Sequence, residues 1–297
     1  MIDKKNKFYK ILVVAGGWSD EREISLMSGK NVYSCLLKNK FNVKFFNLKK
    51  NNIEKILLYS PDIIFNSLHG EYGEDGGLNS LAKKNNIIIS HSGAISSALC
   101  FNKRLLKNFL KKEINILSPK EVINENQIKY PVILKPNWGG SSKGIKFIKN
   151  KEELRKKINN PKYLIEEIIY GKELTVTVIE NNKKIKALGV TEIEFNNMHY
   201  DYIAKYRKNK SIHFLPARIS NSQYEFLIKI SKEIFRICNC NGIARIDYIM
   251  SKKNGKIFFL EMNTHPGLTK LSLAPEQANY QGLSYLSLLK QIINSAL

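Results

Sequence analysis

The chain has 297 residues, of which 43% are hydrophobic, and this is ample for a packed core divided into two or three subdomains. It contains no run of about 18 apolar residues, so the sequence predicts no membrane-spanning helix. Lysine and arginine number 48 against 26 acidic residues, which gives a formal net charge of +22. Because the lysines are scattered among asparagines and isoleucines, we interpret this charge as a compositional bias and expect no specific nucleic-acid partner.

The cysteines and the N-terminus both indicate a cytoplasmic protein. Cys35, Cys100, Cys238 and Cys240 form no C-x-x-C pair and match no common zinc spacing. Buried thiols in a reducing compartment are the simplest interpretation. The basic N-terminus continues into the apolar run 11–15 without a small-residue cleavage site, so we expect a first core strand there and not a signal peptide.

Up to about residue 91, predicted strands alternate with predicted helices. The first strand, 11–15, ends in two glycines, and Ser19 then precedes a helical pattern through Leu37 as its N-cap. The further elements are strands at 42–46, 62–66 and 87–89 and a helix at 78–84. This alternation predicts an open parallel sheet with its ligand loops at the carboxyl ends of the strands.

Beyond residue 91 the pattern changes to hairpins and longer helices. Residues 94–112 are expected to form one helix, or two end to end. The polar, aromatic stretch 196–211 has no period and is interpreted as a loop or lid. The remaining expected elements are an antiparallel pair at 132–135 and 145–148, helices at 152–157, 222–238 and 277–295, a strand at 163–168, and hairpins at 174–180/185–193 and 243–250/256–262.

The last of these hairpins carries a candidate metal site. Residues two apart on a strand share a face, so Glu261 and Asn263 point the same way. A two-residue turn would place Asp247 on the opposite face, whereas a three-residue loop at 253–255 sets it opposite Glu261. We therefore predict a type I turn with Gly255 left-handed in a G1 bulge. Hard oxygen ligands of this kind suit Mg²⁺ shared with nucleotide phosphates, although solvated carboxylates are the default alternative.

A glycine-rich loop at 136–144 precedes that hairpin. Its small residues let backbone amides approach an anion, Ser141 and Ser142 add donors, and Lys135 directly before it can pair with a phosphate. The loop lacks the Gly-Lys-Ser/Thr order of a P-loop and is a weak signal alone. The strand at 163–168 leads into a connector whose backbone can meet an adenine.

Together these motifs resemble the D-alanine–D-alanine ligase family of the ATP-grasp superfamily, from about residue 11 to the C-terminus. The likeness is carried by residues 16–25, 68–76, 135–144, 166–175, 200–206, 244–247 and 263–272. It implies a mixed α/β chain with an ATP-grasp fold and an N-terminal open parallel-sheet domain. The expected division is 1–91 for substrate, 92–178 for the central unit, and 179–297 for the metal site and lid, with the last helix packing back on the first domain.

The resemblance also implies a reaction. ATP would phosphorylate the carboxylate of one D-alanine, and the amine of a second D-alanine would displace the phosphate, for peptidoglycan synthesis. The implied cofactors are ATP and Mg²⁺ or Mn²⁺, with two ions per site. The implied partners are D-alanine and ATP, with no membrane; a homodimer is left open.

Family motifs assign individual residues to four overlapping sets. The nucleotide set comprises Lys103, Lys135, Ser141, Ser142, Glu166, Ile169, Glu173 and Lys205. The metal set comprises Asp247, Glu261 and Asn263. The substrate set comprises Glu21, His69, Arg245, Gly267 and Ser272. The catalytic set comprises Glu21, Ser141, Lys205, Tyr206 and Arg245.

Within these sets, Glu21 would bind the ammonium of the first D-alanine and Ser272 the carboxylate of the second. Arg245 and the amide of Gly267 would stabilise the oxyanion. Tyr206, where D-lactate-accepting relatives carry phenylalanine, favours the dipeptide. Two alternatives remain open: another ATP-grasp carboxylate–amine ligase, and a basic nucleic-acid-binding protein.

Overall fold

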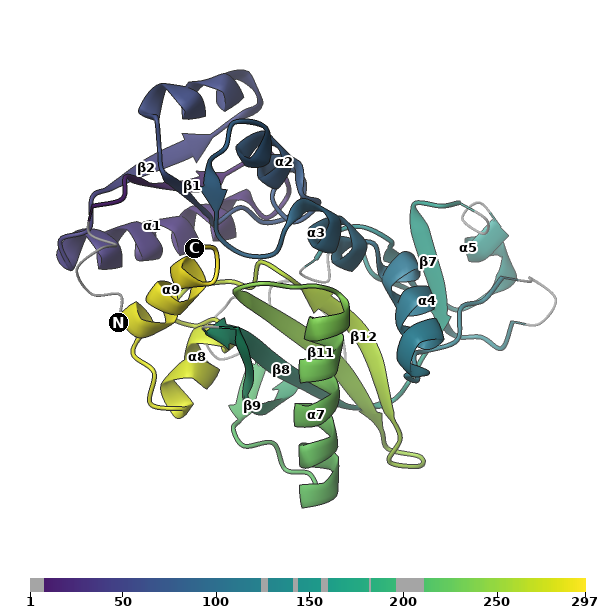
Figure 1. Ribbon diagram of the computed structural model, residues 1–297. Helices are drawn as coiled ribbons and strands as arrows, with labels where there is room; N and C mark the ends of the chain where they lie inside the picture. Colours follow the sequence, from purple (N-terminus) through teal and green to yellow (C-terminus); the bar gives the residue numbers. More distant parts are fainter. Residues whose placement is uncertain (1–7, 124–127, 141–143, 156–159, 182, 196–210) are drawn as a thin grey trace.

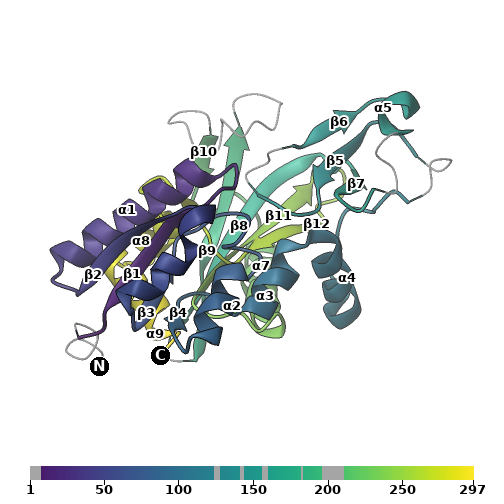
Figure 2. The ribbon, with the colours of Figure 1, turned by 90° about the horizontal axis from the view of Figure 1, so that it is seen from above.

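The computed structural model describes residues 8–123, 128–140, 144–155, 160–181, 183–195 and 211–297. Within these ranges the strands form three sheets, which follow one another along the chain (Figures 1 and 2). No helix among the described residues is both long and apolar enough to cross a bilayer.

The first sheet is parallel, with strand order β2-β1-β3-β4, as predicted. Its strands are β1 (Ile11–Gly16), β2 (Val43–Leu48), β3 (Ile63–Asn66) and β4 (Ile88–Ile89). The helices of this part are α1 (Arg22–Lys38), the 3-10 helix η2 (Lys50–Tyr59), which was not predicted, and α2 (Gly77–Lys84).

Strand β1 is buried along its whole length because both of its faces are covered. Successive side chains alternate between the faces. Ile11 and Val13 therefore join a core with α1 and the C-terminal helix, whereas Leu12 and Val14 join a second core with η2 and α2. The N-cap prediction for Ser19 was wrong: its hydroxyl donates to the carbonyl of His69 at 2.6 Å and joins two loops.

The central part begins with two helices end to end, α3 (Ala94–Phe101) and α4 (Lys103–Ile114). They are separated at Asn102, whose side chain accepts a hydrogen bond from the amide of Leu105 and caps α4. An antiparallel sheet of order β6-β5-β7 follows. Its elements are β5 (Val132–Pro136), β6 (Lys146–Ile148), the short helix α5 (Lys151–Arg155) and β7 (Tyr163–Glu167).

The third sheet is antiparallel, with order β10-β9-β8-β11-β12. Its strands are β8 (Gly171–Asn181), β9 (Lys184–Phe195), β10 (Ser211–Phe214), which was not predicted, β11 (Ile243–Ser251) and β12 (Ile257–Asn263). The expected domain boundary at 178/179 falls inside β8.

Helices cover both faces of this third sheet. Val176 and Val178 pack with α7 (Asn221–Ile237), and the intervening Thr177 faces α8 (Leu273–Tyr280), where its amide donates to Gln277 at 2.7 Å. The prediction of a single closing helix at 277–295 was wrong. This segment is divided into α8 and α9 (Tyr285–Asn294) by a turn in which Gly282 has φ +73°.

The hairpin of β11 and β12 places Asp247 opposite Glu261, as predicted, and Gly255 has φ +66°. The predicted three-residue loop was wrong, however. The amide of Ser251 donates to the carbonyl of Lys256, so the turn has four residues, 252–255. Leu260 is then the extra residue of a bulge between the pairs Asp247–Glu261 and Tyr248–Phe259. The bulge restores the register that brings the two carboxylates together.

A buried histidine lies where the first sheet meets the C-terminal part of the chain. His91 stacks on His265 with ring centroids 4.8 Å apart and meets the ring of Phe65 edge-on. Burial, followed by the nearby charge of His69, lowers the pKa of His91 to about 3. The folded protein therefore keeps this imidazole neutral at pH values where the unfolded chain protonates it.

We predict that His91 weakens the fold in mild acid. Its contribution to the free energy of unfolding is complete above the unfolded pKa of 6.5 and is lost progressively as the pH falls toward about 3. The loss relative to neutral pH is about 2 kcal/mol at pH 5. Chemical denaturation at pH 7.5 and pH 5 should show His91→Asn, which tolerates the φ of +71°, losing less stability than the wild type. Parallel losses in the two proteins would contradict this assignment.

Candidate active site

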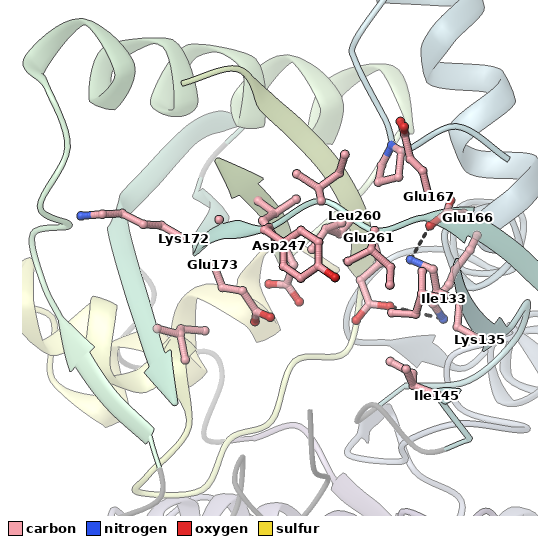
Figure 3. A pocket seen from close by; sticks show the side chains of 18 of the residues that line it. Ile133, Lys135, Ile145, Glu166, Glu167, Lys172, Glu173, Asp247, Leu260 and Glu261 are labelled. Carbon is pink, nitrogen blue, oxygen red and sulfur yellow. Dashed lines mark ion pairs between the residues drawn. The ribbon is translucent and has the colours of Figure 1, made fainter. Parts of the chain in front are cut away.

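Two adjoining cavities lie at the junction of the three sheets. The larger, of about 560 Å³, opens between the three-stranded sheet and strands β8, β11 and β12 (Figure 3). The smaller, of about 80 Å³, lies between that region and the loops of the first sheet. The residues that line both cavities include Lys103, Gly139, Gly140, Glu173, Asp247 and Glu261. Anything passed between the cavities must cross this shared boundary.

The larger cavity has apolar walls on two sides. Ile133 and Phe147 come from the three-stranded sheet, and Ile249 and Leu260 come from the hairpin. Ile169 lies in the connector between β7 and β8 and also lines the cavity. A slot with apolar walls and exposed backbone at one end suits a flat heteroaromatic ring.

A buried carboxylate with two lysines forms the polar end of this slot. Glu166 on β7 is fully buried, and one of its carboxylate oxygens pairs with Lys107 of α4. The other oxygen lies 2.5 Å from the ammonium of Lys135 (Figure 3). Burial alone would raise the pKa of Glu166, but the two ammonium groups hold it below its usual value. Burial, followed by the charge of Lys135, lowers the pKa of Lys107, against the opposing effect of its pair with Glu166.

The predicted metal ligands come together on the hairpin. Asp247 and Glu261 are directly opposed, and Asn263 lies two residues further along β12. Within the described ranges, no three His, Cys, Asp or Glu side chains converge as a metal site. The set therefore consists of two carboxylates and one amide, an oxygen donor set that fits Mg²⁺ or Mn²⁺ when phosphate oxygens complete the shell.

Neighbouring groups hold both carboxylates in place. The guanidinium of Arg245 donates to both oxygens of Asp247, with its Nη2 2.8 Å from Oδ2. The hydroxyl of Thr175 donates to Asp247 Oδ1 at 2.6 Å from the neighbouring strand β8. Glu261 lies 3.3 Å from the ammonium of Lys103, which also donates to the carbonyl of Gly139. Lys103 thus connects the glycine-rich loop to the metal set.

The smaller cavity contains all five residues of the predicted substrate set: Glu21, His69, Arg245, Gly267 and Ser272. His69 lies 3.4 Å from Glu74 and 3.4 Å from the hydroxyl of Ser28. Burial lowers the pKa of His69, but Glu74 and Glu21 together raise it above its usual value.

Glycines bring backbone close to the reactive side chains of this cavity. A Cβ on Gly140 would lie 3.3 Å from a carboxylate oxygen of Glu21, so the glycine-rich loop reaches the first-sheet residue directly. A Cβ on Gly267 would lie 2.8 Å from the hydroxyl of Ser272. Ser272 is the N-cap residue of α8, so its position at a helix start is confirmed, and the helix amides next to it favour an anion.

Four predicted residues, Ser141, Ser142, Lys205 and Tyr206, lie outside the described residues. The structure also adds three side chains that the sequence prediction missed: Glu74, Lys107 and Thr175. Lys107 had a readable signal, because it follows Lys103 by one helical turn on the buried stripe of α4. Glu74 and Thr175 had none, since a loop glutamate and a strand threonine are ordinary in those positions.

The chain is similar to known proteins over almost its whole length. The family model described as D-ala D-ala ligase C-terminus matches residues 106–294. A D-alanine–D-alanine ligase of Rickettsia felis is 38% identical, covering 96% of this chain and 91% of that protein.

Two solved structures have the same arrangement. The D-Ala:D-Ser ligase VanG from Enterococcus faecalis superposes with a TM-score of 0.80 at 26% identity, covering 97% of this chain and 99% of that one. The D-alanine–D-alanine ligase from Bacillus anthracis complexed with ATP superposes with a TM-score of 0.78 at 28% identity, covering 96% of each chain.

Proposed function

The chain belongs to the D-alanine–D-alanine ligase family, and on this basis we propose that it joins two D-alanines into D-alanyl-D-alanine with ATP, for peptidoglycan synthesis. The single observation that carries the proposal is the shared boundary of the two cavities. It brings a phosphate-compatible lysine, Lys103, and two carboxylates, Asp247 and Glu261, between an apolar slot and a small polar pocket.

ATP occupies the larger cavity in this proposal. Its adenine lies between the apolar walls, beside Glu166 and the backbone at Ile169, and Glu173 on β8 takes the ribose hydroxyls. The polyphosphate points toward Lys103 and Lys135, with Ser141, Ser142 and Lys205 as further predicted contacts. Phosphoryl transfer depends chiefly on positioning and on neutralising charge, which is what this set of cations provides.

Asp247, Glu261 and Asn263 would hold Mg²⁺ or Mn²⁺, two ions in all. When bound, these ions neutralise charge on the phosphates. Arg245 and Lys103 balance the two carboxylates in the structure as described. The hydroxyl of Thr175 orients Asp247, as an outer hydrogen-bond donor commonly does for a metal-binding carboxylate.

The smaller cavity holds the amino acids. Glu21 takes the ammonium of the first D-alanine, next to His69, and the γ-phosphoryl group of ATP passes to a carboxylate oxygen, releasing ADP. The amine of the second D-alanine then attacks the carbonyl carbon, and the bond to the phosphate oxygen breaks. Arg245 and the amide of Gly267 face the oxyanion, while Ser272 and the start of α8 take the second carboxylate. Ser141 and Tyr206 are predicted to link Glu21 to the lid.

The wider assignments belong to the same proposal. The expected division into 1–91, 92–178 and 179–297 is changed at its second boundary: in this proposal the central unit ends at residue 170 and the last unit begins at Gly171, so that β8 stays whole. We place the protein in the cytoplasm, which agrees with its four free cysteines. A homodimer remains open, and no specific nucleic-acid or membrane partner is proposed.

We predict that phosphate release from ATP depends on D-alanine. The assay supplies the purified chain with ATP, Mg²⁺ and one of D-alanine, L-alanine, D-serine or D-lactate, and identifies the product by mass. D-Alanine alone should give phosphate and the dipeptide, and L-alanine should give neither. Turnover with another compound but not with D-alanine would assign the chain a different substrate.

Replacing Glu21 by Gln should raise the KM for the first D-alanine at least tenfold, because about 2 kcal/mol of charge-assisted hydrogen bonding to the ammonium is lost. The KM for ATP should change little. Glu23→Gln, an exposed position on the same helix, is the matched control. Equal D-alanine kinetics in both variants would place the ammonium elsewhere.

Thr175→Val should raise the Mg²⁺ concentration for half-maximal activity about tenfold, because Asp247 loses its orienting donor. Thr177→Val is the control. It lies on the same face of β8 and is equally buried, and its hydroxyl has no hydrogen-bond partner among the described residues. Identical Mg²⁺ titrations of the two variants would show that Thr175 does not act on the metal site.

A further inference from the structure

Lys107 stands behind the nucleotide cavity. It follows Lys103 by four residues on α4, and residues at this spacing lie on one face of a helix. Both side chains are buried, but only Lys103 lines the cavities, while the ammonium of Lys107 is directed to Glu166. A lysine in this position does not touch a ligand in the cavity. Its effect on the site must pass through the carboxylate.

Glu166 holds two cations at once, one on each oxygen. Glu166 is paired with Ile133 across β5 and β7, and Lys135 lies two residues along β5 on the same face as Ile133. This register brings the ammonium of Lys135 to Oε2, while Lys107 reaches Oε1 from the helix. The carboxylate is fully buried, so its charge must be balanced by these groups.

Of the two lysines, only Lys135 lines the cavity and can reach a bound nucleotide. Lys135 and Glu166 line the large cavity, so the ammonium of Lys135 can turn toward a nucleotide bound there. If it were the only partner of Glu166, turning toward a nucleotide would leave a buried carboxylate unpaired, which is strongly unfavourable. With Lys107 on the other oxygen, Lys135 can move while Glu166 remains neutralised.

We propose that Lys107 is a positioning residue of the nucleotide site: as the permanent partner of Glu166, it frees Lys135 to bind the nucleotide. This inference rests on the proposed function of the large cavity as the nucleotide site. Without Lys107, Glu166 retains Lys135, and nucleotide binding competes with a buried ion pair. The effect falls on nucleotide affinity and leaves the amino-acid sites unaltered.

The test is Lys107→Met, which keeps the length of the side chain and removes its charge. The KM for ATP and the Kd for ADP, the latter from calorimetry, should both rise at least tenfold, while the KM for D-alanine stays within about twofold and kcat within about threefold. Lys111→Met, exposed one turn further along the same helix, should match the wild type. If the Lys107→Met variant has a lower Tm but binds ADP with unchanged Kd, Lys107 contributes only to stability, and the proposal is overturned.

A second comparison tests the route through the carboxylate. In a Glu166→Gln background there is no charge left to hold Lys135, so adding Lys107→Met should not weaken ADP binding further. A further tenfold loss in the double variant would show that Lys107 acts without Glu166. Both charges are removed together in the double variant, so the route through Glu166 can be tested even if Lys107→Met alone does not fold.

A measurement of ADP binding to the wild type also shows whether a negative result contradicts the role of Lys107 or the proposed reaction. If the wild type binds ADP but shows no D-alanine-dependent turnover, the proposed reaction fails and the calorimetric comparison still tests Lys107. If the wild type does not bind ADP, the nucleotide site itself is wrong, and the proposal is overturned with it.

Discussion

Pairing of buried charge is the constraint on which the rest of this structure depends. Three carboxylates at the junction of the sheets are balanced by cations: Glu166 by two lysines, Glu261 by Lys103, and Asp247 by Arg245. Three of these cations come from a different strand or helix than the carboxylate that they meet. The ion pairs therefore hold α4, β5, β7 and β12 around one space, and a buried carboxylate that lost all of its cationic partners would be left uncompensated.

The same arrangement prepares the site for an anionic ligand. In this structure Lys103 and Lys135 balance carboxylates at the place where a polyphosphate is expected to bind. Asp247 and Glu261 pair with cations at the place where a metal ion is expected. Binding then exchanges one set of charge pairs for another instead of exposing unpaired groups in a cleft of low dielectric. Preorganised charge of this kind is the main requirement for phosphoryl transfer.

A shared apolar core fixes the substrate pocket next to this charged boundary. Side chains of β1 and α1 pack with those of α8 and α9, so the first sheet and the C-terminal end of the chain form one body. Small polar contacts complete the junction: the hydroxyl of Ser28 accepts from the amide of Leu268 and lies near His69. Glu21 thereby reaches a pocket whose other wall is formed by residues more than 200 positions later.

The sequence by itself determined the class of fold and most of the strands and helices, and it supplied the residues proposed for the site. These follow from local periodicity, from glycines in turns, and from motifs such as Ala244–Asp247, where a few neighbouring residues carry the signal. It also determined that Asp247 faces Glu261, although the route was different, because the turn has one residue more and a bulge at Leu260 corrects the register. The break between α8 and α9 was missed since one glycine in a helical pattern is a weak stop signal.

Only the tertiary structure decided which charges meet. Lys107, Lys135 and Glu166 lie on three elements, and no local pattern relates a lysine on a helix to a glutamate 59 residues later. Long-range pairing depends on how the elements pack, on which faces are buried, and on the cost of leaving a buried carboxylate alone. Those quantities exist only once the chain is folded, and they give the cavity its charge.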